Sequence, residues 1–317
     1  MSTIAVDAMG GDSAPEEVVK GAILAKKEGV DVILSGDENL IKSYLGNEKI
    51  PVINYPQVIS MDDDPAKAIR SNKDSSIIGA LNLVKEKKAD AVFSAGSTGA
   101  TLIGAISVLG KIKGVTRPTI ASVLPGKEKE VILVDSGANL EVKPKVLYQF
   151  AIMGSKLSEL LFDIENPRIG LINNGEESSK GRELEKATFK LLKSSQLNFI
   201  GNVEGKDFAT SKVDVFVTDG FTGNVVLKTL QGVAKLQQDL ISKSLRENLF
   251  KPLLIPVKNA ISPVKSMLNP NSTNGSYLLG VNGVVIIGHG SSNSEAIKNA
   301  LLFTSRAVEK RFINKFT

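Results

Sequence analysis

The sequence predicts a three-layer α/β/α fold built on a mostly parallel, doubly wound sheet. Short apolar strands alternate with helical patterns almost throughout the 317 residues. Many of these strands are continuous apolar runs, which is typical of parallel strands that helices cover on both faces. Because no linker or low-complexity tract divides the chain, we expect residues 1–317 to form one α/β unit. Ligands of such sheets bind at the carboxyl ends of the strands.

The predicted strands are short runs rich in Val, Ile and Leu. In chain order they are Ile4–Val6, Val30–Leu34, Pro51–Tyr55, Ala91–Ser94, Thr119–Leu124, Val131–Val134, Arg168–Ile172, Phe199–Asn202, Val213–Val217 and Val284–Ile287. The first helix begins near Ser13-Ala-Pro-Glu-Glu17, where a capping serine precedes a proline and two acidic residues.

The stretch from about 225 to 275 departs from this alternation and predicts a helical protrusion. Its apolar residues continue one long helical face from Leu227 to Leu245. The segment Leu249–Leu268 that follows is apolar and basic, and its three prolines break any long helix. Such a segment suits an anionic membrane surface and equally suits burial against a second subunit. The candidate membrane contacts are Leu253, Leu254, Ile255 and Val257.

Composition excludes several classes of function. The chain has no Cys, so it contains no disulfide, thiol nucleophile or Cys metal site. It starts with a strand pattern instead of a signal peptide, and no apolar run is long enough to span a bilayer, so we expect a cytoplasmic protein. The net charge of +5 suits nucleic acid, a membrane surface or an acidic partner protein. Nucleic acid is disfavoured, because the lysines are spread along the chain and aromatic residues are few.

Two segments repeat one another and suggest anion binding. Asp90–Ala100 and Asp214–Asn224 each contain an aspartate, an apolar strand, a Gly-x-Thr-Gly turn and a helix start. Glycines allow close approach of a ligand, and a helix start offers unpaired N–H groups and a positive dipole end. The alternative is that strand-to-helix turns simply need glycine. The candidate ligands of the anion are Gly96, Ser97, Thr98, Gly99, Asp219, Gly220, Thr222, Gly223 and Asn224.

Other polar side chains follow predicted strands. Asn224 either donates to an oxygen in the cleft or caps its helix. Lys180 stands near a helix start, a position that suits a cation facing phosphate, although it is equally consistent with a solvated lysine. Asp135 and Asn139 either bind a ligand or hold their turn. His289, the only histidine, either donates to phosphate, acts as an acid or base, or fills its turn.

No metal or cofactor is expected. The acidic clusters at Met61–Pro65 and Asp7–Asp12 offer oxygen ligands, but helix starts attract acidic residues without any metal. A Walker-type phosphate loop is absent from the sequence, which argues against an ordinary NTPase. The segment that follows Val284–Ile287 only approaches a dinucleotide-binding pattern.

Seven motifs in a fixed order carry a resemblance to a known family. They are Asp7-Ala-Met-Gly-Gly-Asp12, Ser94-Ala-Gly-Ser-Thr-Gly-Ala100, Asp135-Ser-Gly-Ala-Asn139, Gly175-Glu-Glu with Lys180-Gly181, Gly201-Asn-Val-Glu-Gly205, Thr218-Asp-Gly-Phe-Thr-Gly-Asn224 and Gly288-His-Gly-Ser-Ser-Asn293. From its first strand to its last helix, the chain resembles the bacterial phosphate acyltransferases of phospholipid synthesis, the PlsX family. It departs from the family at Ser97, where Asn is usual, and at Asn274–Gly280, where the family pattern is Tyr-x-Gly-Ala-x-Leu-Leu-Gly.

The resemblance implies an enzyme that moves a fatty acyl group from acyl carrier protein to inorganic phosphate. The acyl phosphate product serves a membrane acyltransferase that acylates glycerol 3-phosphate. Family members are similar in fold to phosphotransacetylases and to isocitrate and isopropylmalate dehydrogenases, and they are homodimers that associate peripherally with the membrane. In the family, the residues that match Lys180 and Asn224 are proposed to act in the active site.

The residues fit this chemistry. We expect Lys180 to bind phosphate and Asn224 to orient it or to donate to the oxyanion of the thioester carbonyl. The backbone N–H groups of Gly96–Gly99 and Gly220–Gly223 are expected to complete the cradle. Three alternatives stay open: a short-chain enzyme that uses acyl-CoA, a dehydrogenase of related fold, and a non-enzymatic basic protein that binds membrane surfaces.

Overall fold

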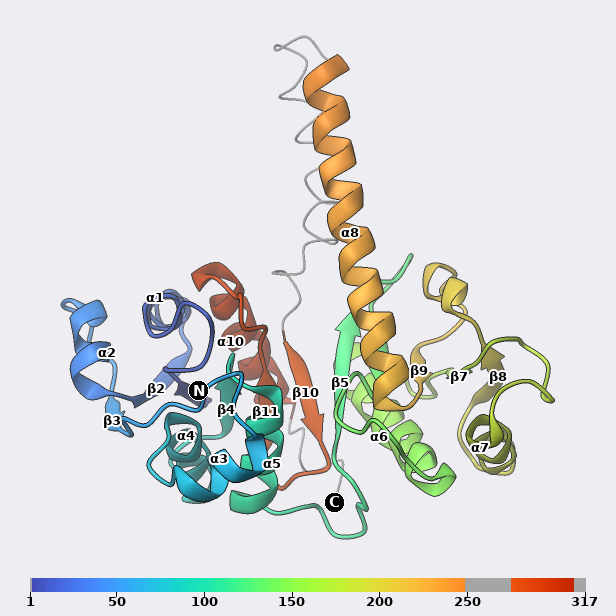
Figure 1. Ribbon diagram of the computed structural model, residues 1–317, viewed down its shortest axis with the longest axis horizontal. Helices are drawn as coiled ribbons and strands as arrows, with labels where there is room; N and C mark the ends of the chain where they lie inside the picture. Colours follow the sequence, from blue (N-terminus) through green and yellow to red (C-terminus); the bar gives the residue numbers. More distant parts are fainter. Residues whose placement is uncertain (1, 249–274, 311–317) are drawn as a thin grey trace.

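The computed structural model describes residues 2–248 and 275–310, and their strands form one eleven-stranded sheet (Figure 1). The strand order is β3-β2-β1-β4-β11-β10-β5-β6-β9-β7-β8. The strands are β1 (Thr3–Asp7), β2 (Asp31–Gly36), β3 (Val52–Asn54), β4 (Ala91–Ser94), β5 (Thr119–Leu124), β6 (Val131–Val134), β7 (Ile169–Ile172), β8 (Phe199–Val203), β9 (Val215–Val217), β10 (Ser276–Leu279) and β11 (Val284–Ile287). All ten predicted strands are confirmed, and β10 is additional.

The sheet consists of two parallel blocks that run in opposite directions. Strands β3, β2, β1, β4 and β11 form one block, and β6, β9, β7 and β8 form the other. Between the blocks, β10 pairs antiparallel with both β11 and β5, and β5 pairs antiparallel with β6. The sheet is therefore mostly parallel, as predicted, with its reversal in the middle.

Helices cover both faces of the sheet, as the three-layer prediction requires. Several begin at residues suited to a helix start: Asp37 caps α2 and Asp64 caps α3. Helix α1 begins at Glu16, within the segment where a helix start was predicted. The expected serine cap was wrong, because the residue at the cap position is Pro15 and not Ser13. The helices are α1 (Glu16–Lys27), α2 (Glu38–Leu45), α3 (Pro65–Ser71), α4 (Ser76–Lys85), α5 (Thr98–Val108), α6 (Pro144–Phe162), α7 (Glu183–Lys193), the 3-10 helix η1 (Gly205–Ala209), α8 (Gly220–Asn248) and α10 (Ser294–Glu309).

The buried apolar residues divide by face of the sheet. On one face, side chains of α1, α2, α6, α7 and α10 join a single cluster that extends along the sheet. On the other face there are two clusters, one under α3, α4 and α5 and one under η1 and the start of α8. Helices α5 and α8 therefore flank the central strands β10 and β5 from opposite sides, and the space between them is where a ligand has access to the sheet.

Helix α8 is the protrusion that the sequence predicts. Its 29 residues extend about 43 Å at 1.5 Å per residue, and the helix rises away from the body of the molecule (Figure 1). Leu227 and Leu230 pack on the cluster beneath its base, whereas Val233, Leu236 and Leu240 are exposed. The candidate membrane contacts Leu253, Leu254, Ile255 and Val257 lie outside the described residues. Within the described part of the chain, every helix is too short or too polar to cross a bilayer.

Candidate active-site cleft

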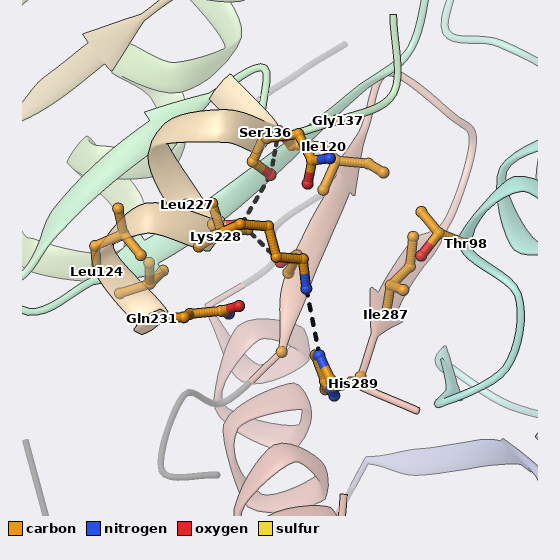
Figure 2. A pocket seen from close by; sticks show the side chains of 16 residues that line it. Thr98, Ile120, Leu124, Ser136, Gly137, Leu227, Lys228, Gln231, Ile287 and His289 are labelled. Atoms are coloured by element: carbon orange, nitrogen blue, oxygen red, sulfur yellow. Dashed lines mark hydrogen bonds between the residues drawn. The ribbon is translucent and has the colours of Figure 1, made fainter. Parts of the chain in front are cut away.

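A cleft of about 290 Å³ lies between α5 and α8 on the central strands β10 and β5. This volume is near the lower end of the range for small-molecule sites, roughly 300–1,000 Å³. Its residues come from α5, from β5, β10 and β11, from α8 and from the turns after β6 and β11 (Figure 2). The lining residues are Thr98, Ile120, Ser122, Val123, Leu124, Ser136, Gly137, Asn224, Leu227, Lys228, Gln231, Gly275, Ser276, Ile287, Gly288 and His289.

The pairing of the strands explains why the turns after β11 and β6 meet here. Ile287, the last residue of β11, pairs with Ser276, and Ser276 pairs with Ser122. Ser122 in turn pairs with Leu133, one residue before the end of β6. The carboxyl ends of these two strands therefore lie at nearly the same level on either side of β10 and β5, as expected for a ligand site in such a sheet.

The floor of the cleft carries a chain of hydroxyl groups. Ser122 Oγ donates to Ser136 Oγ at 2.7 Å, and Ser136 Oγ donates to the carbonyl of Ile120 at 3.2 Å. Ser122 has then used its only proton, so Ser276 Oγ donates to Ser122 Oγ at 2.8 Å. The apolar residues Val123, Leu124 and Leu227 also line the cleft, which therefore combines a polar part with an apolar wall.

One wall is the beginning of α5, where the first Gly-x-Thr-Gly turn was predicted. Ser97 Oγ caps the helix by accepting from the N–H of Ala100 at 3.4 Å, and Thr98 lines the cleft. Gly96 N–H donates to Ser94 Oγ at 3.1 Å. Among the described residues, no acceptor takes the N–H of Ser97, Thr98 or Gly99. This helix start therefore keeps free donors and a positive dipole end beside the cleft.

The opposite wall is one face of α8. Asn224, Lys228 and Gln231 are spaced four and three residues apart, so they lie on the same side of the helix, and all three line the cleft. Asn224 stands above the turn after β6, because a β-carbon on Gly137 would lie 3.6–3.7 Å from atoms of the Asn224 side chain. Asn224 is thus in the cleft, as its ligand interpretation requires.

Lys228 reaches from α8 across the cleft to the turn after β11. Figure 2 shows its side chain directed at His289, and its Nζ lies 3.4 Å from His289 Nε2. The other ring nitrogen of His289, Nδ1, lies 2.8 Å from Ser291 Oγ and accepts from the Ser291 backbone N–H at 3.2 Å. Burial and the Lys228 charge lower the pKa of His289, while Asp12 opposes the shift. The ring is therefore neutral near pH 7, and Lys228 supplies the positive charge.

Asp135 and Asn139 hold the turn after β6. Asp135 Oδ1 accepts from the N–H groups of Ile120, Gly137 and Ala138 at 2.8–3.3 Å. Its Oδ2 accepts from the backbone N–H and the side-chain Nδ2 of Asn139, both at 2.8 Å. Burial raises the Asp135 pKa and these hydrogen bonds oppose that rise. Neither residue lines the cleft, so the turn-holding alternative is the one that the geometry favours.

The second Gly-x-Thr-Gly turn is packed against this same turn. Gly220 N–H donates to the Asn139 carbonyl at 2.8 Å, Thr222 N–H donates to Asp219 Oδ1 at 2.7 Å, and Gly223 N–H donates to the Asp219 carbonyl at 2.9 Å. These three donors are used within the protein. The N–H groups of Gly220, Thr222 and Gly223 are therefore not free to bind phosphate in this structure. Phosphate binding by these residues stays a prediction.

Lys180 lies outside the cleft lining. It is exposed in the loop 173–182, where its N–H donates to the Glu177 carbonyl at 3.1 Å. The loop is joined to the start of α8 through Arg182, whose guanidinium binds both Glu185 and the buried Asp219. The structure therefore links the Lys180 loop to the helix of Asn224 through Arg182, without bringing Lys180 itself to the cleft.

Sequence reasoning missed several cleft residues, above all Lys228 and Gln231. Both lie in the predicted helical protrusion, which was interpreted by its apolar residues alone. The signal that would have found them is the spacing of Asn224, Lys228 and Gln231, which places three polar side chains on one face of α8. No group of three or more potential metal-ligating side chains occurs in the described ranges 2–248 and 275–310.

Solved structures of other proteins share this fold. The EutD phosphotransacetylase from Staphylococcus aureus has a TM-score of 0.63 and 18% sequence identity, with 96% of this chain and 93% of that chain covered. A 4-hydroxythreonine-4-phosphate dehydrogenase from Klebsiella pneumoniae has a TM-score of 0.55 and 14% identity, over 96% and 99% of the two chains. The expected likeness to phosphotransacetylases is confirmed, and the likeness to isocitrate and isopropylmalate dehydrogenases stays a prediction.

Curated relatives found by sequence are more similar to this chain in sequence than these solved structures are. A phosphate acyltransferase of Halothermothrix orenii is 43% identical over 320 residues, covering 98% of this chain and 96% of the relative. Another from Leptospira biflexa is 45% identical over 316 residues, covering 96% of this chain and 93% of the relative. The family model described as "Fatty acid synthesis protein" matches residues 2–315. The chain therefore belongs to the fatty acid synthesis protein family, the PlsX family, whose relatives named above are phosphate acyltransferases.

Proposed function

We propose that this protein transfers a fatty acyl group from acyl carrier protein to inorganic phosphate and forms an acyl phosphate for phosphatidic acid synthesis. The proposal rests on groups that face one another across the cleft. The free N–H groups at the start of α5 lie on one side, and the Lys228 ammonium and the Asn224 amide of α8 lie on the other. A cation and a helix start on opposite sides of a small cleft suit a compact dianion. The family membership supports the acyl transfer.

The reaction balances without a cofactor or a covalent enzyme intermediate. An oxygen of hydrogenphosphate attacks the thioester carbonyl and forms a tetrahedral oxyanion. The carbon–sulfur bond then breaks, the sulfur takes the proton of hydrogenphosphate, and acyl phosphate and free thiol remain. Phosphate needs positioning more than deprotonation, because it is partly dianionic near neutral pH.

Each cleft residue has a role in this proposal. Lys228 and the N–H groups of Ser97, Thr98 and Gly99 bind phosphate, and the neutral His289 sets the position of the Lys228 ammonium. Asn224 donates to the oxyanion, and a preorganised donor of this kind lowers a barrier by about 3–4 kcal/mol. The apolar wall of Val123, Leu124 and Leu227 receives the acyl chain. Lys180 enters the proposal from the family resemblance alone, as a second cation on the loop tied to α8.

The test is incubation of the purified chain with palmitoyl acyl carrier protein and phosphate. Acyl phosphate is trapped with hydroxylamine and measured as the hydroxamate. We expect product only when phosphate is present, and we expect acetyl-CoA to be a poor donor. Preference for acetyl-CoA would favour the short-chain alternative, and thioester loss that is independent of phosphate would contradict the transfer to phosphate.

The proposal also names two partners, acyl carrier protein and a second copy of the chain, on the basis of the charge and the exposed apolar residues of the protein. The net charge of +5 favours the acidic acyl carrier protein, so added salt should raise the KM for this donor. We also propose that a second copy of the chain covers the α8 stripe. This apolar surface on α8 is 46–60% exposed and consists of Phe221, Val225, Val233, Leu236 and Leu240.

Two measurements test these contacts. Sedimentation should show a dimer for the wild type and a monomer for Leu236→Glu, with Gln237→Glu as the control of equal charge on the same helix. Peripheral contact with the cytoplasmic membrane surface rests on the sequence of Leu253–Val257 alone. Unchanged sedimentation with anionic vesicles after Leu254→Glu and Ile255→Glu would remove those two residues from membrane binding.

A further inference from the structure

Asp7 is a buried carboxylate for which the proposed chemistry has no use. It is the last residue of β1 and is 3% exposed. In the sheet it pairs with Ser35 of β2 on one side and with Ser94 of β4 on the other. Ser94 Oγ donates to Asp7 Oδ2 at 2.6 Å, and the N–H of Met9 donates to Oδ1 at 3.3 Å. Burial raises the pKa of the Asp7 carboxyl, and hydrogen bonds from Ser76, Ser94 and Met9 oppose that rise. A buried carboxyl group is costly unless its oxygens are bonded, so these bonds hold its geometry.

The Ser94 hydroxyl connects Asp7 to the turn before α5. Ser94 Oγ accepts from the N–H of Gly96 at 3.1 Å while it donates to Asp7. The two hydrogen bonds therefore form one path, which runs from Gly96 N–H through the Ser94 hydroxyl to Asp7 Oδ2. Gly10 closes the contact, because a β-carbon there would lie 2.6 Å from Asp7 Oδ2 and 2.7 Å from the Gly96 nitrogen.

The turn that this path fixes leads directly into the cleft. Gly96 precedes Ser97, which caps α5, and Thr98, which lines the cleft wall. The other end of the same segment reaches the opposite turn, because Asp12 N–H donates to the Gly290 carbonyl at 2.8 Å, next to His289. Residues 7–12 therefore join the start of α5 to the turn of His289, which contacts Lys228.

We propose that Asp7 is a positioning residue that, through Ser94, aims the first N–H groups of α5 at the phosphate. This inference rests on the proposed function, since it assigns the phosphate to the α5 side of the cleft. Donors act on a developing or bound charge only if they are held in place beforehand. Loss of the Ser94 hydroxyl leaves the Asp7 carboxylate without its short hydrogen bond and leaves Gly96 N–H without an acceptor.

Ser94→Ala, with Ser35→Ala as a matched control, tests the inference. Both serines are 0% exposed and flank Asp7 at the same register, but Ser35 Oγ donates to the Ser76 carbonyl and stands outside the path to Gly96. With saturating acyl donor, we expect Ser94→Ala to raise the phosphate KM about tenfold, the effect of losing one hydrogen bond, with little change in kcat. Ser35→Ala should leave the phosphate KM unchanged. Equal phosphate KM values for the two variants would overturn the inference.

A double-mutant cycle tests whether Asp7 and Ser94 act along one path. Because Asp7 acts through Ser94, Asp7→Asn and Ser94→Ala should raise the phosphate KM by less together than the product of their separate effects. Multiplicative effects would contradict the path. Phosphate binding, followed by ³¹P NMR, separates this inference from the proposed function. A wild-type chain that binds phosphate without acyl transfer would overturn only the proposed function, whereas one that binds no phosphate would overturn both.

Discussion

The α-carbon of Gly223 packs against the carbonyl of Asp135, so closely that a β-carbon at position 223 would lie 1.8 Å from that oxygen. This contact seats the start of α8 on the turn after β6. Any side chain at position 223 would push α8 away from the turn, and with it the Asn224 and Lys228 side chains that line the cleft.

Gly223→Ala is therefore expected to destabilise the fold by at least about 1–3 kcal/mol, the usual cost of overpacking, because the atom it meets is backbone. Gly232→Ala is the matched control, since a β-carbon at Gly232 of the same helix meets nothing within 4 Å. It should raise the free energy of unfolding by up to about 1 kcal/mol. Urea unfolding measures both, and equal stability of the two variants would refute the close approach.

Lys228→Gln should remove the charge that the proposed phosphate site depends on. A hydrogen bond to a charged group contributes about 1.5–3 kcal/mol, so kcat/KM for phosphate should fall about 10- to 150-fold. Lys235→Gln makes the same change two turns further along α8, at an exposed residue outside the cleft lining. Steady-state kinetics with varied phosphate measures both, and a similar loss in Lys235→Gln would point to a general effect of charge.

The titration of His289 should report on its neighbours. Burial first, and then the Lys228 charge, lower the pKa of His289 from 6.5, while Asp12 raises it. Lys228→Met should therefore move the pKa upward, and Asp12→Asn should move it further down. Because the chain contains a single histidine, one imidazole resonance followed by NMR against pH gives the answer without assignment. An unchanged pKa in Lys228→Met would contradict the contact across the cleft.

Acid stability should depend on Asp214, next to β9. Arg168 binds both of its carboxylate oxygens and Lys129 binds one, and together they lower the Asp214 pKa from 3.8 to about 2 against the effect of burial. A carboxyl whose pKa is lower in the folded state stabilises the fold above pH 3.8 and loses that contribution as the pH falls through about 2. The shift corresponds to a contribution on the order of 2 kcal/mol.

Arg168→Met should raise the Asp214 pKa and move the midpoint of acid unfolding to higher pH. Lys206→Met provides the control, because the pair that Lys206 forms with Glu204 is exposed on the lysine side and contributes about 0–1 kcal/mol. Circular dichroism against pH gives both midpoints. Identical midpoints would remove the Asp214 ion pairs from acid stability.

Most of the architecture followed from local pattern. Parallel strands buried on both faces are apolar throughout, so runs such as Val131–Val134 and Val284–Ile287 were identifiable without any tertiary contact. Strand β10 was not, because Ser276–Leu279 is short and begins with a polar residue. The reversal of the sheet was equally hidden, since it depends on the pairing of β10 with β5, which is far away in the sequence.

The sequence predicted less of the candidate site than of the fold. The two Gly-x-Thr-Gly turns have the same pattern, yet one leaves the N–H groups of Thr98 and Gly99 open, whereas the other is filled by the turn of Asp135. A glycine permits the close approach of a ligand and of a neighbouring backbone alike. Which of the two lies against a given glycine depends on the fold and cannot be inferred from the local sequence. Lys228 was missed for a similar reason, since the helix was interpreted by its apolar residues alone.

The late position of β10 and β11 in the chain has a consequence for biosynthesis. Both strands are inserted between β4 and β5, so a ribosome must deliver residues 276–287 before the two parallel blocks can join into one sheet. The cleft also needs Ser276, Gly288 and His289 from this final part. A prematurely terminated polypeptide would thus contain both Gly-x-Thr-Gly turns and still be unable to form the cleft.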